Sequence, residues 1–299
     1  MIFIKYKAVF IGLSIALVIA SGVLMQTYGI KRGIDFTGGS VIDVTFEKNA
    51  PEEIFSAKGG PASGWEKEDI KPYRTGDYTY RFISSKTYEE ISPVITTLVN
   101  GDGLNPFQFT QVSTVGPTLG AEMTKKAVIA IIVVVLAILA FIAFAFRAVS
   151  HPVPSWKYGV IAMVTLLHDI IVPSGVYVIL SHRYGAEVDT FFVIALLTII
   201  GISISDKIVV FDRIRENLKL SGNKRSFEEI VGMSLSQTFT RSVNTSVTVI
   251  LALLALYLFG PVMTKWFTLT LMIGVFVGTY SSIFVASPLL TVWNNKKSR

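Results

Sequence analysis

The chain has 299 residues, of which 51% are hydrophobic and only 16% are charged, against about 25% charged residues in an ordinary soluble protein. Half of its charged residues, 24, fall in residues 31–126, whose net charge is −2, so the formal net charge of +6 does not come from a polar domain that could bind nucleic acid. The chain has no cysteine, which excludes disulfides and thiolate metal sites, and its mean hydropathy of +0.57 indicates a membrane protein carrying one soluble-like domain.

The first predicted element is an apolar span at about Ala8–Tyr28, which follows the basic residues Lys5 and Lys7. About 20 apolar residues are enough to cross the hydrocarbon core as a helix. The alternative is a cleaved signal peptide, but this apolar run is longer than a usual signal core and no small-x-small site closes it. We therefore expect a transmembrane helix in residues 1–30.

Residues 31–126 predict a small α+β domain. Thr87–Asn100 has a helical pattern weakened by Pro93, and the stretch between Ala57 and Gly76 is rich in Gly, Pro and Ser, as loops are. Three segments have the residues or the alternation of strands: Val41–Phe46, Tyr78–Ile83 and Phe107–Val112.

A glycine-rich segment precedes the first of these strands. Residues 33–39 read Gly-Ile-Asp-Phe-Thr-Gly-Gly, with Gly33, Asp35, Gly38 and Gly39 as its distinctive positions. The spacing is not that of a dinucleotide-binding loop, and the segment does not open a predicted helix. Taken alone, it predicts a turn.

Five more apolar spans are predicted in residues 127–299: Ala127–Phe146, Tyr158–Leu180, Thr190–Phe211, Ser242–Phe259 and Trp266–Leu290. Six spans place both termini on one side. Twelve basic residues lie in the tails and loops of that side: Lys5, Lys7, Arg147, Lys157, Arg213, Arg215, Lys219, Lys224, Arg225, Lys296, Lys297 and Arg299. The short loops of the other side hold only Arg183 and Lys265, so the positive-inside rule predicts cytoplasmic termini and an extracytoplasmic domain at 31–126.

Ionisable side chains inside spans are costly and are therefore candidate functional residues. Asp169 lies at the midpoint of the third span, beside His168, and Pro173 would free the carbonyl of residue 169. The group predicts either a site that carries protons or a structural aspartate bonded to a neighbouring helix, and the residues alone do not choose between them.

Asp206 lies five residues from the end of the fourth span, with Ser203 one helical turn away on the same face. A partly desolvated carboxyl at this depth is suited to binding and releasing a proton. The alternative is a carboxylate near the interface that water reaches. Lys207 points about 100° away from Asp206, and we expect it to extend to the cytoplasmic headgroups.

Arg241 begins the fifth span, and Asn244, Thr245 and Thr248 continue from it as a polar stripe that should pack against another helix. Arg241 can pair with Asp206 or extend to the headgroups. Ahead of it, Ser226–Glu229 matches a capping box and predicts a short surface helix that leads into the span.

Asp212–Asn217, at the end of the fourth span, reads Asp-Arg-Ile-Arg-Glu-Asn. We interpret Asp212, Arg213 and their neighbours mainly as a stop-transfer charge cluster with some salt bridges. The whole sequence contains no P-loop, no G-x-S-x-G and no His pair at metal-ligand spacing, so we expect neither an enzyme nor a metal site.

These motifs, in this order, resemble the SecF family of the bacterial Sec translocon, within the resistance-nodulation-division (RND) superfamily. The resemblance covers essentially the whole chain. The segments that carry it are Gly33–Gly39, Val115–Pro117, Leu167–Asp169, Asp206 with Ile208–Asn217, and Arg241–Thr245.

The resemblance implies a polytopic α-helical membrane protein, half of an RND-type bundle, with one extracytoplasmic α+β domain between helices 1 and 2. It implies a multi-pass protein of the bacterial cytoplasmic membrane that pairs with SecD, assists SecYEG, with a YidC-type insertase as a further partner, and promotes late translocation and release of unfolded polypeptide. By residue, Asp206 would be the carboxylate that binds the coupling proton and Arg241 its partner. Asp169 would assist, with His168, Ser203, Asn244 and Thr245 in support, and no cofactor other than the ion is implied.

One position departs from the family pattern, because Lys207 stands where the family usually has threonine. A lysine there could alter the titration of Asp206. Three other functions compete: half of an RND-type small-molecule or lipid exporter, a scaffold that only docks SecD or an insertase, and an intramembrane hydrolase using Asp169 and Asp206. The single outer domain disfavours the first, and the absence of a Gly-x-Gly-Asp context disfavours the last.

Overall fold

The computed structural model describes residues 2–47, 70–74, 76, 78–99, 106–145, 153–221 and 224–295. The chain divides into two compact units. The first consists of Met1–Ile30, Ala130–His182 and Phe191–Arg299, and the second of Lys31–Ile129 and Arg183–Thr190. Composition predicted boundaries after residues 30 and 126, and it did not assign the loop at 183–190 to the second unit.

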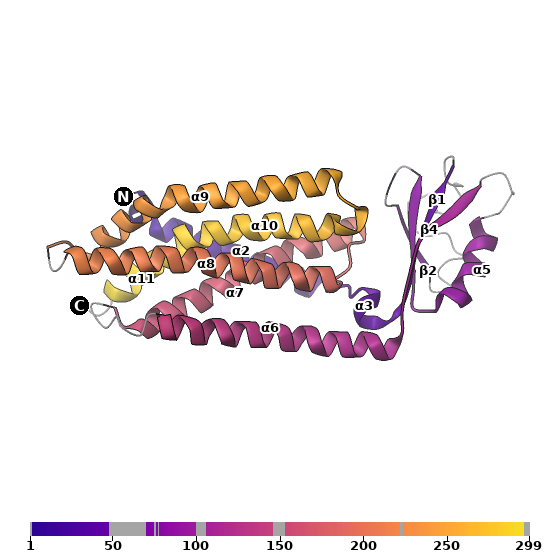
Figure 1. Cartoon of the computed structure of the whole chain (residues 1–299), viewed down its shortest axis with the longest axis horizontal. Helices are drawn as coiled ribbons and strands as arrows, with labels where there is room; N and C mark the ends of the chain where they lie inside the picture. The colour runs from indigo at the N-terminus through magenta and orange to yellow at the C-terminus, as the bar shows by residue number, and fades with distance from the viewer. Residues whose placement is uncertain are drawn as a thin grey trace. The chain divides into compact units, whose positions relative to one another are not determined.

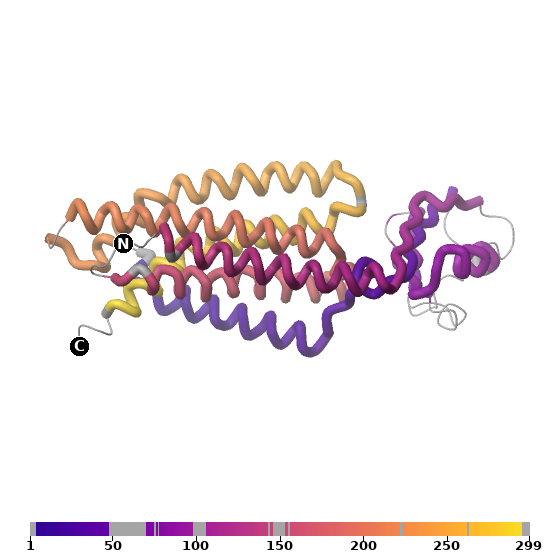
Figure 2. The backbone as a smooth tube through the Cα atoms, turned by 60° about the horizontal axis from the view of Figure 1, so that its bottom comes forward, coloured from indigo at the N-terminus to yellow at the C-terminus, as the bar shows by residue number. Residues whose placement is uncertain are grey.

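Within the described residues, six helices are long and apolar enough to cross a membrane, which confirms the predicted multi-pass helical class. They are α2 (Lys7–Tyr28), α6 (Pro117–Ala145), α7 (Ser155–Tyr184), α8 (Thr190–Ser221), α9 (Phe227–Phe259) and α10 (Lys265–Ser281) with its continuation. Figures 1 and 2 show α2, α7, α8, α9 and α10 side by side as a bundle. Its largest apolar cluster includes Tyr158, Phe211 and Leu235.

Polar contacts tie together the helix ends at one end of the bundle. A short helix, α1 (Ile2–Lys5), precedes α2. Lys7 Nζ lies 2.5 Å from Glu228 Oε1 at the start of α9, and 3.4 Å from Thr291 Oγ1 near the C-terminus. The two ends of the chain therefore share one end of the bundle, as an even number of spans requires (Figure 1).

Several helices are longer than the apolar runs predicted, among them α8 and α9. α8 continues ten residues beyond Phe211, because the charged residues that follow are good helix formers. The capping box is present, since Ser226 Oγ accepts from the Glu229 amide and Glu229 Oε2 accepts from the Ser226 amide. It opens α9 itself, so the prediction of a separate short surface helix was wrong.

The sixth span changes its winding near its middle. α10 ends at Ser281, a π-helix follows at Ser282–Ala286, and α11 (Ser287–Asn295) completes the span. A short 3₁₀ turn, Val262–Thr264, leads into α10. Such π-turns are rare and occur frequently at functional sites.

The second unit contains a four-stranded antiparallel sheet of order β2-β3-β1-β4, formed by β1 (Gly39–Phe46), β2 (Ile70–Arg74), β3 (Thr79–Ser84) and β4 (Phe107–Val115). Helix α5 (Tyr88–Val99) packs on it, with Ile91 and Ile95 buried against Ile42 and Phe82. The three predicted strands and the predicted helix are all present.

Strand β2 contradicts the loop predicted between Ala57 and Gly76. It pairs with β3 alone, so it is an edge strand, and Pro72 is tolerated there because an edge strand need not donate on both sides. The rest of that loop, residues 57–69, lies outside the described residues, as do the basic positions Arg147, Lys296, Lys297 and Arg299.

The glycine-rich segment contains one short helical turn, α3 (Ile34–Thr37), where the sequence predicted only a turn. Gly38 and Gly39 follow with φ of +76° and +124°, conformations that favour glycine. A Cβ on Gly39 would lie 2.2 Å from the Ser84 carbonyl oxygen, so the start of β1 requires glycine.

Two other parts of the second unit contact this segment. The Gly33 amide donates to the Val188 carbonyl at 2.8 Å, and Asp35 Oδ2 accepts from the Thr190 amide at 2.9 Å, at the first residue of α8. On the other side, a Cβ on Gly120 of α6 would lie 2.9 Å from the Gly38 nitrogen. Residues 33–39 are thus fixed against the beginnings of both α6 and α8.

Candidate functional site

Asp206 of α8 directs its carboxylate toward the fifth and sixth spans. Oδ1 accepts a hydrogen bond from Ser242 Oγ at 2.5 Å, and Oδ2 accepts one from Ser282 Oγ at the start of the π-turn. A hydroxyl can donate to an ionised carboxylate and can also accept from a protonated one. The two serines can therefore hold Asp206 in either protonation state.

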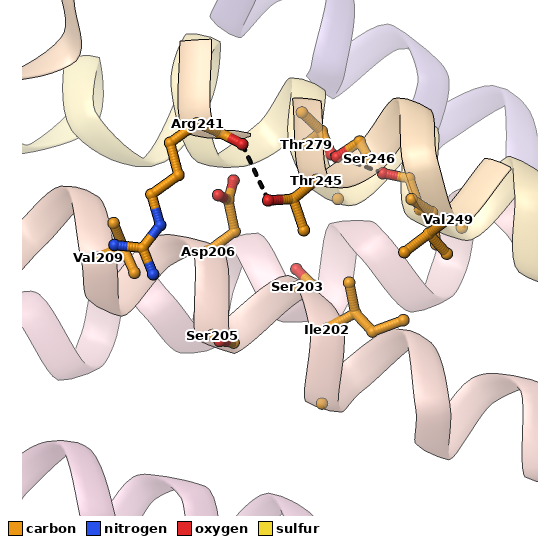
Figure 3. A pocket seen from close by; sticks show the side chains of 14 residues that line it. Ile202, Ser203, Ser205, Asp206, Val209, Arg241, Thr245, Ser246, Val249 and Thr279 are labelled. Carbon is orange, nitrogen blue, oxygen red and sulfur yellow. Dashed lines mark hydrogen bonds between the residues drawn. The ribbon is translucent and has the colours of Figure 1, made fainter. Parts of the chain in front are cut away.

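A cavity of about 310 Å³ opens beside Asp206, between α8, α9 and α10. Figure 3 shows Asp206, Ser203 and Ser205 on one side of it and Arg241 and Thr245 on the other. Its volume and the polar side chains among its mixed lining suit several water molecules. The fourth span thus places a partly buried carboxyl next to space that a proton could cross by way of water.

Arg241 lines the same cavity but is not paired with Asp206. Its side chain is exposed and extends from α9 toward α8 beside Val209 (Figure 3). Among the described residues no salt bridge joins the two, so the predicted ion pair is absent. Both oxygens of the Asp206 carboxylate instead accept hydrogen bonds from hydroxyls, those of Ser242 and Ser282.

Asp169 of α7 is the centre of a second polar cluster, inside the bundle. Its side chain is fully buried, with 0% exposed. Oδ2 accepts from Lys207 Nζ at 2.5 Å, from Ser281 Oγ at 2.8 Å and from Ser203 Oγ. Asp169 is thus bonded to neighbouring helices, as a structural aspartate would be. It also belongs to an ionisable cluster, so a role as a proton site stays compatible with the structure.

Lys207 corrects the sequence prediction. Its side chain is also 0% exposed, and its ammonium points inward to Asp169 and Ser203 instead of extending to the headgroups. The rotation of about 100° from Asp206 was predicted, but the partner across the bundle was not. α8 therefore presents Asp206 to α9 and α10, and Lys207 to α7.

His168 joins this cluster from the same helix as Asp169. Its Nδ1 lies 2.8 Å from Asp169 Oδ1, while its buried Nε2 has no hydrogen-bond partner among the described residues. Ser203 was expected on the face of Asp206. It lines that cavity, but its hydroxyl serves Asp169 and Lys207.

The polar stripe after Arg241 is only partly enclosed within this chain. Thr245 lines the cavity, and its hydroxyl donates to the Arg241 carbonyl at 2.9 Å. Asn244 and Thr248 are exposed, and Thr248 donates to the Asn244 carbonyl at 2.8 Å. Within this chain, Asn244 and Thr248 therefore do not pack against another helix as predicted.

The charge cluster at the end of the fourth span contains the salt bridges expected of it. Arg213 lies 2.6 Å from Glu216 and donates to Gln237 Oε1 of α9 at 2.7 Å. Asp212 lies 3.4 Å from Arg215. These contacts connect α8 to α9 near the end of the bundle that holds both termini.

The second unit has its own group of charges around the loop at 183–190. Arg81 binds Asp43 through two hydrogen bonds of 2.8 Å, which raise the pKa of Arg81. Burial raises the pKa of Glu187 to about 7, although Lys71, Lys31 and Arg81 oppose this rise. Glu187 is therefore a candidate for titration near neutral pH.

Sequence reasoning missed four contributors: Ser242, Ser281, Ser282 and Glu187. The serines carried no signal of their own, because serine is common in membrane helices and its bonding partners lie far away in sequence. Adjacency offered one available clue, since Ser281-Ser282 falls within an apolar span. In the described part of the chain, no three His, Asp or Glu side chains gather in a way that could hold a metal ion.

Two family models match the chain. "Protein export membrane protein SecD/SecF, C-terminal" matches residues 96–296, and "SecD/SecF GG Motif" matches residues 24–50, which contain Gly38 and Gly39. The second match covers the segment fixed between the starts of α6 and α8.

Characterised relatives and a solved structure are similar over nearly the whole chain. The protein translocase subunit SecF of Thermobaculum terrenum is 41% identical, covering 98% of this chain and 94% of the relative. That of Anaerolinea thermophila is 35% identical over the same shares. The crystal structure of SecDF, a translocon-associated membrane protein from Thermus thermophilus, matches with a TM-score of 0.82 and 31% identity over 99% of this chain. This chain spans only 39% of that SecDF chain.

Proposed function

Because the chain belongs to the SecF family of protein translocase subunits, we propose that it uses the proton-motive force, together with a SecD subunit, to promote late translocation and release of polypeptides outside the cytoplasmic membrane. The observation that carries this proposal is Asp206, a partly buried carboxyl held by two hydroxyls beside a cavity within the membrane spans.

The proposed cycle begins with proton binding at Asp206. An ionised carboxylate at this depth is stabilised by its two serine donors and by the nearby Arg241 guanidinium, while the protonated form keeps both hydroxyl contacts. Moving one charge across the membrane releases about 2.3 kcal/mol per 100 mV. We assign the coupling ion as H⁺ and assign the chain no catalysed covalent reaction.

The proposed partner is SecD, as a second set of spans packed against this one. The exposed polar residues Asn244 and Thr248 support a second subunit, because lipid offers such side chains no hydrogen-bonding partner. The SecDF crystal structure, of which this chain covers 39%, supports the same arrangement. SecYEG, and a YidC-type insertase, are proposed as further partners.

The proposed orientation places both termini in the cytoplasm and residues 31–126 outside, where the domain would contact the emerging unfolded polypeptide. A cysteine-free chain allows a direct test, since single cysteines can be labelled one at a time. A membrane-impermeant maleimide added to intact cells should label Gln111→Cys in β4 and should not label Lys224→Cys. The reverse pattern would contradict the orientation.

The proton site is tested by Asp206→Asn, which keeps the shape and removes the charge. We expect the proton-motive-force-dependent part of export of a secretory precursor into membrane vesicles to be lost. Asp212→Asn, in the exposed charge cluster, is the matched control and should retain it. If Asp206→Asn kept the wild-type level of proton-motive-force-dependent export, the proposed proton role would be contradicted. That result would favour a scaffold that only docks its partners.

A further inference from the structure

The two buried carboxylates of the bundle have different hydrogen-bonding environments. The oxygens of Asp206 contact hydroxyls, whereas Asp169 has the ammonium of Lys207 at 2.5 Å in addition to the hydroxyls of Ser203 and Ser281. An ammonium has three donors and no acceptor. It can therefore stabilise an ionised carboxylate but has nothing to offer to the proton of a neutral one.

Charge makes the same distinction. Asp169 and Lys207 are both fully buried, so a proton on Asp169 would leave the Lys207 ammonium uncompensated in the bundle interior. Breaking a buried pair in this way is strongly unfavourable. Protonating Asp206 breaks no such pair, because among the described residues it has none.

The two carboxylates are bonded through neighbouring residues of the same helices. Asp206 and Lys207 are consecutive on α8, and Ser281 and Ser282 are consecutive at the π-turn. Ser281 donates to Asp169, and Ser282 donates to Asp206. On each of these two helices, one of two adjacent residues thus belongs to the Asp169 cluster and the other to the Asp206 site.

We propose that Lys207 keeps Asp169 ionised and thereby restricts proton binding in this bundle to Asp206. The inference rests on the proposed function of Asp206 as the proton site, and makes Lys207 a positioning residue that acts through Asp169. Asp206 is then the proton-binding one of these two carboxyls.

In the part of the chain that the structure describes, the helices packed around Asp169 carry three other titratable groups that bear on it: His168, Tyr280 and Arg241. His168 on α7 contacts Asp169 Oδ1, and Tyr280 on α10 lies with its ring 6.5 Å from that of His168 and donates to the Phe10 carbonyl of α2. Arg241 on α9 lines the Asp206 cavity. Of these, only His168 contacts Asp169, and the neutral imidazole can satisfy Asp169 Oδ1 by donating from Nδ1.

Infrared difference spectroscopy of the purified full-length chain tests this assignment without an export assay. In Asp206→Asn we expect no protonated-carboxyl band from Asp169. In Asp206→Asn/Lys207→Met a new band should appear, and adding Asp169→Asn should remove it. A band already assigned to Asp169 in Asp206→Asn, or no new band after loss of Lys207, would overturn the proposal.

Because loss of Lys207 alone could prevent folding, a second comparison removes both charges of the Asp169–Lys207 pair. Asp206→Asn and Asp206→Asn/Lys207→Met/Asp169→Asn should have the same protonated-carboxyl absorption. A band lost in the triple variant would mean that Asp169 is neutral beside Lys207, which contradicts the inference.

Export supplies a readout that a merely structural lysine would not alter. With Asp206 intact, Lys207→Met should add a second transition to the pH profile of proton-dependent export, and Lys207→Met/Asp169→Asn should restore the single transition. An unchanged profile in a folded Lys207→Met chain would also overturn the proposal. If Asp206→Asn exports normally, the proposed function fails while the infrared result on Asp169 still stands.

Discussion

Glu187 predicts a pH-dependent loosening of the loop that holds the glycine-rich segment. The side chain is mostly buried, and burial raises its pKa from 4.5 to about 7 against the opposing effect of Lys71, Lys31 and Arg81. The folded unit therefore favours the neutral acid. Its contribution to stability is complete below the ordinary pKa and is lost as the pH rises through about 7.

The size of the effect follows from the pKa shift. At 1.36 kcal/mol per pKa unit, the rise to about 7 corresponds to roughly 3–4 kcal/mol, or about a 300-fold change in a local opening equilibrium. Partial access of water lowers this figure, so it is an upper bound. The lost stability should be felt where the loop is hydrogen-bonded, at the Gly33 amide on the Val188 carbonyl and the Val188 amide on the Lys31 carbonyl.

Hydrogen–deuterium exchange of the full chain in detergent measures this opening. After correction for intrinsic exchange rates, protection of the peptides covering residues 31–39 and 183–190 should fall between about pH 5 and about pH 8. Glu187→Gln should flatten that slope. Glu89→Gln, an exposed glutamate of α5, should not. The same slope in Glu187→Gln as in the parent chain would refute the reasoning.

Two further substitutions test local structure. Gly39→Ala should destabilise the start of β1 by about 2–3 kcal/mol, because a Cβ at φ +124° would lie 2.2 Å from the Ser84 carbonyl oxygen. Gly116→Ala has no atom within 4 Å of its Cβ and is the control, so equal protection of β1 in both variants would argue against the clash. Ser226→Ala removes the capping box and should weaken the first turn of α9 by about 1 kcal/mol. Faster exchange at Glu229 would be the readout, and unchanged exchange would mean that the cap contributes little there.

The spans were predictable because the bilayer fixes how many apolar residues a crossing helix needs. Their ends were not, since α8 runs on through charged residues that hydropathy counts as loop. Three strands of the sheet were found from their residue types or their alternation, and β2 was missed because its Pro72 is acceptable only at a sheet edge, a fact of topology and not of local sequence.

In the candidate site, depth in the membrane identified Asp169 and Asp206, and helix rotation separated Lys207 from Asp206. What failed was the assignment of partners. Extension to the headgroups is the common outcome for a lysine near a helix end, and only the fold reveals that Asp169, 38 residues earlier, lies within 2.5 Å. For Arg241, nothing in the local pattern indicated that Ser242 and Ser282 would be the hydrogen-bond donors to Asp206.

The π-turn at Ser282–Ala286 joins two helical registers in the sixth span. Its backbone accommodates one residue more per turn than an α-helix does, so every side chain after it is rotated by about 100° from the face it would otherwise occupy. Ser281 before the turn and Ser282 at its start bond the two carboxylates, and the stretch after the turn directs Ser287 and Leu290 into the bundle. Without the extra residue, a single straight helix could not satisfy both halves. A one-residue deletion here would leave composition and hydropathy almost unchanged, yet it would put one of the two halves on the wrong face.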